Sequence, residues 1–266
     1  MEYVIIAITV LFGAGLTFFS GFGLGTILLP VFSLFFDLPT AVGATAIVHL
    51  ANNLFKFGLV SKHIHWNTLI RFGLPAIFLA FVGGLVLTTF DEIEILHSYR
   101  LNDKRFDITM VKIVIGSLMI FFAWLDLSPK FSKINFGRKY LPLGGSLSGF
   151  FGGVSGHQGA FRAAFLSKIG LTKEQFIGTS NAVSLVVDLS RLSVYLFGFA
   201  AITGQENKFL LAISEGKMLL VIGVIFAFLG TYFGKKLIHK TTVSGIQKIV
   251  GVLLFLMGSL MIAGIL

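Results

Sequence analysis

The 266-residue chain contains no cysteine, and only 12% of its residues are charged. The lack of cysteine excludes disulfides, thiol chemistry and thiolate metal sites. A soluble domain is roughly a quarter charged, about twice the share found here. Because 55% of the residues are hydrophobic and 30 are phenylalanines, the composition instead predicts an integral membrane protein that lies in a lipid bilayer.

Several enzyme motifs are absent as well. The chain has no G-x-x-x-x-G-K-[ST] loop, so nothing indicates a built-in ATPase. Neither G-x-S-x-G nor H-E-x-x-H occurs, which argues against hydrolase chemistry. His63 and His65 are too few for a metal site without further ligands. We therefore expect no enzyme activity, no cofactor and no metal.

The few charges favour one sign, with a formal net charge of +9. Such an excess is also found in nucleic-acid-binding proteins. Here, however, the basic residues lie in loops between apolar runs, where the positive-inside rule of membrane proteins explains them. We therefore expect no nucleic-acid partner.

Ten apolar runs form two similar sets. The first set comprises residues 4–19, 24–36, 42–61, 69–90 and 108–125. The second set comprises residues 140–155, 157–169, 174–199, 215–236 and 244–265. The order of lengths matches between the sets, which predicts an all-α transmembrane helical bundle built from two repeats. We assign residues 1–125 and 140–266 to the repeats and residues 126–139 to a cytoplasmic linker.

Individual residues also match between the two sets. At one offset, Gly23 and Leu38 correspond to Gly156 and Leu171. After a two-residue insertion, Gly43, Thr45, Leu50, Asn53 and Lys56 correspond to Gly178, Ser180, Leu185, Asp188 and Arg191. Matches in the same order beside equivalent glycine breaks indicate a duplication.

The second run of each repeat is short for a membrane span. Thirteen residues cover roughly 20 Å of helix, whereas the hydrocarbon core is about 30 Å thick. We therefore predict that the first two runs of each repeat form a broken or re-entrant hairpin that meets at the glycines. Two full spans are the alternative if flanking residues contribute. In either case each repeat crosses the membrane an odd net number of times, so the repeats are inverted.

This topology separates the charges. One side collects Lys62, Arg71, Lys130, Lys133, Arg138, Lys139, Lys168, Lys173, Lys235, Lys236 and Lys240. The other side collects Glu2, Asp37, Asp91, Glu92, Glu94, Asp103, Asp107, Glu206 and Glu215. By the positive-inside rule the basic side is cytoplasmic, which places both termini outside.

Two glycine-rich breaks interrupt the apolar sequence. The stretch 144–162 (GGSLSGFFGGVSGHQGAFR) holds seven glycines and polar residues, and a weaker version spans 20–26 (SGFGLGT). Irregular backbone survives in a membrane only where protein or a water-filled cavity satisfies it, and transporters built from repeats bind substrates at such breaks. The candidate substrate-binding residues are Gly21, Gly23, Gly25, Gly153, Gly156, His157, Gln158 and Arg162.

Three polar residues in the second break, His157, Gln158 and Arg162, suit an anion. Gln158 and Arg162 are four apart and share a helix face. A half-helix that begins near Gly156 points its positive end and free N–H groups into the cavity, and Arg162 adds a planar fork for an oxyanion. The alternative is that Arg162 only reaches toward the membrane interface by snorkelling. Ser155 and His157 resemble a nucleophile and base, but adjacent residues rarely present both groups to one atom.

Polar stripes follow one run of each repeat and are predicted to line or gate the cavity. The stripe on 42–61 comprises Thr45, His49, Asn52, Asn53 and Lys56. The stripe on 174–199 comprises Asn181, Ser184, Asp188 and Arg191. We expect Asp188 and Arg191 to pair, either as a gate or proton-linked switch or as a structural ion pair. Asn52 and Asn53 are equally suited to hold helices together, and His49 to a structural hydrogen bond.

The glycine-rich segments resemble those of the TauE/SafE family of sulfite exporter-like permeases. GFGLGTILLP at 21–30 is close to the family pattern GxGGGxxxxP, and GATAI at 43–47 follows it. GVSGHQGAFR at 153–162 and IGTSN at 177–181 carry the resemblance in the second repeat. The resemblance implies a multi-pass protein of the plasma (inner) membrane that moves small anionic sulfur compounds or organic acids.

Two functions are consistent with these observations. The first is a secondary carrier or facilitator for a small anion, such as a sulfur oxyanion, organosulfonate or small organic acid, with H⁺ or Na⁺ as candidate coupling ion. The second is a membrane scaffold that docks a cytoplasmic partner or anionic lipid through its basic loops. Close-packed glycines suit a scaffold, but a scaffold does not require His157, Gln158 and Arg162 beside the break.

Overall fold

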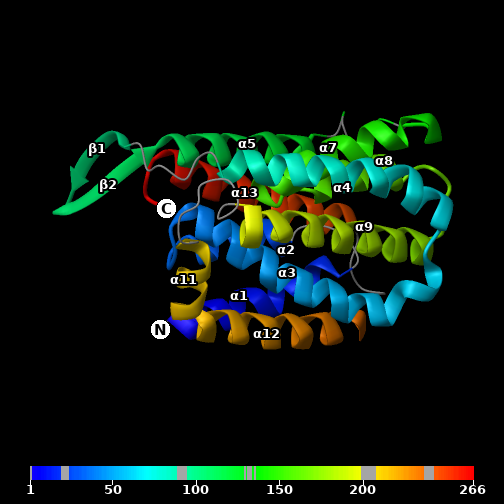
Figure 1. Cartoon of the computed structure of the whole chain (residues 1–266), viewed down its shortest axis with the longest axis horizontal. Helices are drawn as coiled ribbons and strands as arrows, with labels where there is room; N and C mark the ends of the chain where they lie inside the picture. The colour runs from blue at the N-terminus through cyan, green and yellow to red at the C-terminus, as the bar shows by residue number, and fades with distance from the viewer. Residues whose placement is uncertain are drawn as a thin grey trace.

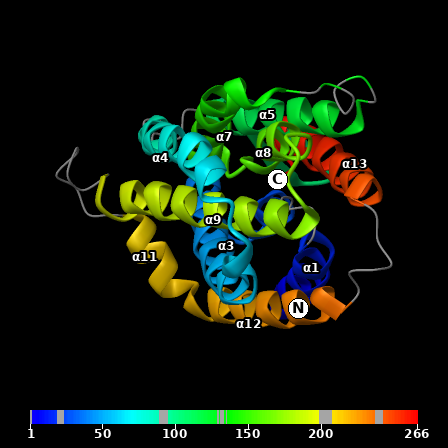
Figure 2. The same cartoon turned by 90° about the vertical axis from the view of Figure 1, so that its right-hand side faces the viewer.

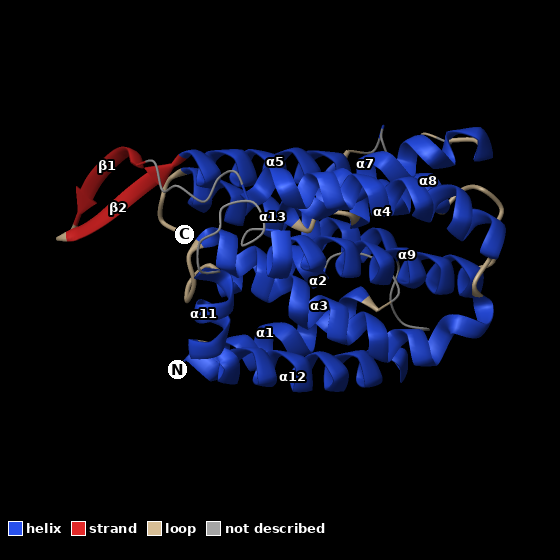
Figure 3. Cartoon of the chain, viewed as in Figure 1, coloured by secondary structure: helices blue, strands red, loops and turns tan. Residues whose placement is uncertain are grey.

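The computed structural model describes residues 2–18, 24–88, 95–128, 130, 134, 136–198, 208–236 and 243–266, and these residues are mostly helical (Figures 1 and 3). The first half contains α1 Glu2–Thr17, α2 Leu24–Phe32, α3 Leu38–Val60, the 3-10 turn η1 Ser61–His63, α4 Trp66–Thr88, β1 Ile95–Leu101, β2 Lys104–Thr109 and α5 Met110–Leu127. The second half contains the 3-10 turn η2 Arg138–Tyr140, α7 Leu141–Ser155, α8 Gly159–Leu166, α9 Lys173–Ser193, the π-helical turn η3 Val194–Gly198, α11 Lys208–Glu215, α12 Lys217–Lys236 and α13 Val243–Ile262.

Within the described ranges, α4, α5 and α12 are long and apolar enough to cross a membrane. Shorter apolar helical stretches cover Glu2–Thr17 and Lys248–Ile262. The longer helices start at polar caps: the Asp37 carboxylate accepts from Thr40 N at α3, and Thr172 and Gln175 form a capping box at α9. The prediction of a helical membrane protein is therefore confirmed.

The two polar helices lie in the middle of the bundle. Figure 2 shows α3 and α9 between a group that contains α4, α5, α7, α8 and α13 and a group that contains α1 and α12. The helix pairs with the most extensive contacts are α4 with α7, α5 with α13, α1 with α12, α3 with α9 and α4 with α9. Polar side chains on α3 and α9 are consequently shielded from lipid by apolar helices.

Glycines bring three of these helix pairs into close contact. A Cβ at Gly149 on α7 would collide with the carbonyl oxygen of Ala76 on α4. On α12, a Cβ at Gly234 would lie 2.6 Å from the carbonyl oxygen of Gly15 on α1. Between α5 and α13, a Cβ at Gly116 would lie 2.8 Å from Gly258 O, and one at Gly258 would lie 2.7 Å from Gly116 O. Small residues therefore permit these backbones to touch, as is common between membrane helices.

The break in the second half is real, although its helix begins later than predicted. Gly156 caps α7 in the left-handed region, with φ of 79°, a conformation that favours glycine. His157 and Gln158 follow, and α8 then starts at Gly159 rather than near Gly156. With eight residues, α8 covers roughly 12 Å and is far shorter than a membrane span.

The described chain is not entirely helical, because β1 and β2 form an antiparallel hairpin where a loop was predicted. Asn102 and Asp103 form its two-residue turn, with φ values of 48° and 61°, as a type I′ hairpin turn requires. The prediction of a purely α fold is wrong here, because residues 98–101 and 105–109, on either side of this turn, alternate polar and apolar side chains. Figure 3 shows the hairpin projecting beyond the helices.

Two details tie the hairpin to the bundle and stabilise its charges. The Tyr99 hydroxyl donates to Ala263 O at 2.6 Å, near the C-terminus. Hydrogen bonds from Ser98 and Arg105 lower the pKa of the Asp107 carboxyl.

A further helix, α11, was also not predicted, because the last-but-one apolar run was expected to start at residue 215.

The close contact between α4 and α7 predicts a stability effect. Gly149→Ala should destabilise the protein by about 1–3 kcal/mol, because the added methyl group forces the two backbones apart. Thermal unfolding in detergent measures this effect. Gly58→Ala on α3 is the matched control, since no atom lies within 4 Å of its added Cβ. Equal melting temperatures for the two variants would contradict the proposed cause.

Candidate functional site

The candidate site is organised around the buried carboxylate of Asp188 on α9. Its Oδ1 accepts from Arg191 Nη2 at 2.8 Å, from Arg191 Nε at 3.1 Å and from Gln158 Nε2 at 3.1 Å. Its Oδ2 accepts from His49 Nδ1 and from Asn53 Nδ2, each at 2.7 Å. The predicted Asp188–Arg191 pair is thereby confirmed, and one carboxylate joins α3, the α7–α8 break and α9.

A chain of amides extends this network along α3 and α9. Asn53 donates its Nδ2 to Asp188, so its Oδ1 faces away and accepts from Asn181 Nδ2 at 3.2 Å. The Asn181 Oδ1 is buried and has no partner among the described residues. The side-chain orientations of both asparagines are therefore set by the carboxylate of Asp188.

Gln158 links Asp188 to Arg162. Its Nε2 donates to Asp188, and its Oε1 accepts from Arg162 Nη1 at 2.9 Å. Arg162 is 1% exposed, so its guanidinium lies inside the protein rather than at a membrane interface. The expectation that Gln158 and Arg162 share a helix face is confirmed, and the snorkelling alternative for Arg162 does not fit this burial.

His157 and Ser155 form a separate contact. Ser155 Oγ donates to Phe151 O at 3.1 Å and lies 2.9 Å from His157 Nδ1. The His157 ring stacks on Phe122, and its Nε2 has no partner within the described ranges. No carboxylate contacts this histidine among the described residues, and neither residue lines the cavity described next. The pair therefore lacks the orienting third group of a catalytic triad.

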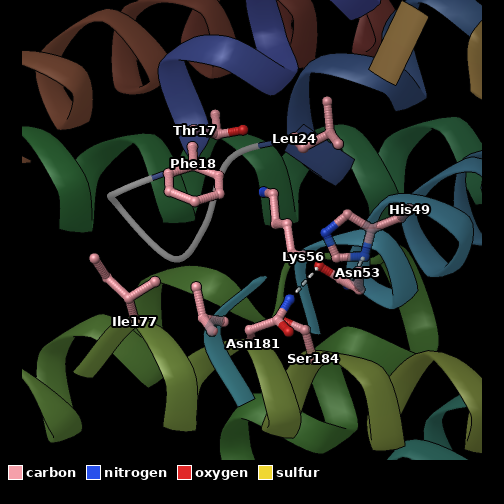
Figure 4. Close-up of a pocket in the computed structure, with 10 residues that line it drawn as sticks. Thr17, Phe18, Leu24, His49, Asn53, Lys56, Ile177, Asn181 and Ser184 are labelled. Atoms are coloured by element: carbon pink, nitrogen blue, oxygen red, sulfur yellow. Dashed lines mark hydrogen bonds between the residues drawn. The ribbon is translucent and has the colours of Figure 1, made fainter. Parts of the chain in front are cut away.

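A small cavity lies between α1, α2, α3 and α9 (Figure 4). Its polar wall is formed by His49, Asn53 and Lys56 from α3 and by Asn181 and Ser184 from α9. The remaining lining residues are Thr17, Phe18, Leu24, Val60 and Ile177. The volume of this cavity is about 20 Å³, which is enough for roughly one water molecule. An anion therefore needs the cavity to widen.

Lys56 is the cation that faces this cavity. Figure 4 shows its side chain extending between Phe18 and Leu24. It is 8% exposed, and its Nζ lies 5.7 Å from the centroid of the Phe18 ring. No carboxylate or hydrogen-bond acceptor contacts this Nζ in the part of the chain that the structure describes.

The structure gathers most predicted site residues but separates others. Gly25 lies beside the break of the other half, since its added Cβ would be 3.5 Å from Gly156 O. Gly153 instead packs against α4, and the Tyr195 hydroxyl donates to its carbonyl oxygen.

Asn52 accepts from Thr231 on α12 at 2.6 Å, outside the cluster, so it holds helices together. Thr45 is buried near Gly25. The predicted Gly21 and Gly23 lie outside the described residues.

Five cavity residues were not predicted from the sequence: Thr17, Phe18, Leu24, Val60 and Ile177. Four of them are ordinary apolar residues in apolar runs, and Thr17 bonds the backbone of its own helix through Gly13 O. No chemical signal distinguishes such residues from lipid-facing or core positions. For Leu24 alone, the sequence contained one indication of a place in the site: Leu24 corresponds to His157 at the offset that relates Gly23 to Gly156.

The described interior holds more positive than negative charge. Its buried residues include three cations, Lys56, Arg162 and Arg191, and one carboxylate, Asp188. Asp188 is bonded to Arg191, Arg162 donates to the neutral amide of Gln158, and no carboxylate of the described residues contacts the Lys56 ammonium. Charged groups far from water are costly unless they are compensated.

Comparison with known proteins identifies one family. The family model described as "Sulfite exporter TauE/SafE" matches residues 5–261 of the chain. No curated protein and no solved structure matches the chain.

The role of Asp188 predicts the behaviour of a neutral variant. Asp188→Asn should destabilise the protein by about 3–5 kcal/mol, because it leaves Arg191 buried without its counter-ion. Chemical or thermal unfolding in detergent measures the change. Asp107→Asn in the exposed hairpin makes the same substitution at a solvent-screened ion pair with Arg105, and it should change the stability little. If both variants unfold like the parent, Asp188 is not the centre of the interior network.

Proposed function

Because the chain belongs to the TauE/SafE sulfite exporter family, we propose that it is a secondary carrier or facilitator for a small anion. The candidate substrates are sulfur oxyanions, organosulfonates and small organic acids. The single observation that carries this proposal is the excess of cations over carboxylates among the buried residues that the structure describes. A small anion would compensate this charge, whereas a scaffold that docks partners through surface loops has no use for it.

The two halves, residues 1–125 and 140–266 joined by 126–139, are proposed to be inverted repeats. The proposal exchanges each helix for its counterpart: α1 for α7, α2 for α8, α3 for α9, α4 for α12 and α5 for α13. Under this exchange the α4–α7 contact becomes the α1–α12 contact, and α4–α9 becomes α3–α12. The α1–α2 contact becomes α7–α8, while α3–α9 and α5–α13 map onto themselves; every one of these contacts is present.

Two contacts between the halves support a two-fold axis that relates them. Gly116 and Gly258 pack reciprocally against each other's carbonyl oxygens. Asn53 and Asp188, equivalent in the sequence, are bonded to each other. Reciprocal contacts of this kind arise where two equivalent elements meet on a two-fold axis.

The directions of the helices support inversion rather than parallel repetition. Gly178, near the start of α9, lies against Val60 at the end of α3, so these counterparts run antiparallel. Gly251 lies near Leu127 while Gly258 meets Gly116, so α5 and α13 also run antiparallel. An axis in the membrane plane reverses each helix in this way, as in known inverted-repeat transporters.

The substrate site is proposed to lie where the two broken hairpins meet. Gly25 of the first break and Gly156 of the second lie side by side there, next to His49. The shortness of α2 and α8 supports hairpins that re-enter rather than cross twice. Gly21, Gly23, His157, Gln158 and Arg162 complete the proposed anion site at the two breaks, and H⁺ or Na⁺ is the proposed coupling ion.

Orientation in the plasma (inner) membrane is proposed from charge. The two chain ends and the hairpin lie at one end of the long axis, and the α3–α4 connection lies at the other (Figure 1). Lys62 belongs to that connection, Lys235 and Lys236 end α12, and basic residues resist translocation. We therefore place the α3–α4 connection in the cytoplasm and both termini outside.

The transport proposal is tested with Arg162 variants. Arg162→Ala should weaken anion binding about ten- to a hundredfold, because a charge-assisted contact contributes about 1.5–3 kcal/mol. Arg162→Lys should retain part of the affinity, since it keeps the charge and loses the planar fork. Calorimetry and liposome uptake with sulfite, sulfate, thiosulfate, sulfonates and carboxylates measure binding and transport.

Arg100→Ala, on the exposed face of the hairpin, is the matched control and should bind like the parent. Each variant must be monodisperse in detergent before its affinity is compared. A folded Arg162→Ala protein with parental affinity and uptake would place the anion away from Arg162. A parent protein that binds and transports none of the anions would contradict the transport proposal itself.

The orientation is tested with single cysteines, which the Cys-free chain permits without background. Asp103→Cys in the hairpin turn should react with an impermeant thiol reagent in intact cells, whereas Lys62→Cys should react only after the membrane is opened. Labelling yields in intact and permeabilised cells measure the accessibility. The reverse pattern would invert the proposed orientation.

A further inference from the structure

We propose that Lys56 is the residue that holds the charge of the transported anion, and that the anion is the counter-ion that Lys56 lacks within the protein. This inference rests on the proposed function and assigns the charge-recognising role within that site. The sequence pattern pointed to Arg162 for this role. The contacts of the buried cations and the comparison of the two halves assign it to Lys56 inside the cavity, in addition to Arg162 at the break.

The surroundings of the three buried cations differ. Arg191 is held by both its Nε and Nη2 on Asp188, and its Nη1 donates to Gly152 O at 3.4 Å. Arg162 donates to Gln158 Oε1 and does not line the cavity. Lys56 lines the cavity, and its ammonium faces the Phe18 ring without a carboxylate or acceptor among the described residues. An anion that enters the cavity therefore meets Lys56.

The equivalent positions of the two halves explain why Lys56 lacks a partner. In the second half, Asp188 and Arg191 are three residues apart on α9 and form an ion pair. In the first half, the equivalent residues are Asn53 and Lys56, also three apart, on α3. Asparagine carries no charge, and this Asn53 side chain is bonded to Asp188 and Asn181. The same spacing thus places a carboxylate beside the cation in one half and a neutral amide in the other.

Groups that suit an anion lie beside Lys56 in the cavity. The Ser184 hydroxyl lines the cavity. His49 also lines the cavity, and its Nδ1 is held by Asp188. An anion in the cavity would therefore meet a hydroxyl group beside the Lys56 ammonium.

This assignment predicts two opposite effects of one substitution. Lys56→Met should weaken anion binding about ten- to a hundredfold, because it removes the charge-assisted contact. The same change should leave the melting temperature of the anion-free protein unchanged or raise it, because an uncompensated buried charge is replaced by an apolar side chain of similar length. A lysine with a purely structural contact would instead lower that melting temperature when removed.

The experiment compares the purified full-length parent with Lys56→Met, Lys56→Arg and Lys62→Met. Lys62 lies six residues further along and is exposed, so the same substitution there is the matched control. Melting temperatures are measured without anion and across titrations of sulfite, thiosulfate, methanesulfonate and acetate, with calorimetry for affinities. We expect Lys56→Arg to keep anion-induced stabilisation, Lys62→Met to match the parent, and Lys56→Met to lose the stabilisation while melting no earlier than the parent without anion.

Three results would overturn the assignment. The first is a Lys56→Met protein that binds an anion within threefold of the parent, which refutes the role of Lys56 and leaves the transport proposal standing. The second is an anion-free Lys56→Met protein that melts clearly below the parent, since Lys56 would then have an internal partner. The third is a parent that none of the anions stabilises, in which case the proposed function fails and this inference falls with it.

Discussion

The arrangement of the interior depends on the hydrogen bonds and the ion pair of the buried Asp188 carboxylate. Far from water, a carboxylate is stable only when charged and polar groups surround it. Asp188 obtains these groups from Arg191 on its own helix, from His49 and Asn53 on α3, and from Gln158 at the α7–α8 break. One side chain therefore fixes the position of two central helices and of an irregular backbone segment that lipid does not tolerate.

Close helix packing makes this arrangement possible. Glycines at the α4–α7, α1–α12 and α5–α13 contacts let the outer helices approach until their backbones touch. These pairs enclose α3 and α9, whose polar faces would otherwise meet lipid (Figure 2). The left-handed Gly156 then ends α7 and turns the chain so that Gln158 reaches Asp188. Close helix packing and the polar network therefore act together to stabilise the buried charges.

The two halves use similar geometry with different charge. Asp188 and Arg191 neutralise each other, whereas Asn53 and Lys56 leave one positive charge at the edge of a cavity. The proposed anion would supply the negative charge that the Asn53–Lys56 pair lacks. This difference connects membership of an exporter family with a physical property of this particular chain.

The sequence alone determined what composition, period and local chemistry control. Low charge and long apolar runs indicated a helical membrane protein, the spacing of Gln158 and Arg162 indicated a shared face, and Asp188 beside Arg191 indicated an ion pair. The hairpin around Asn102 and Asp103 was missed, because its short alternating strands were taken for a charged loop. Only the tertiary structure decided that Asn52 faces α12 while Asn53 meets Asp188, and that Lys56 rather than Arg162 faces the cavity. Neighbours on one polar helix look alike in sequence, and their roles differ because the helices packed around them determine which side chain finds a partner and which is left facing an open space.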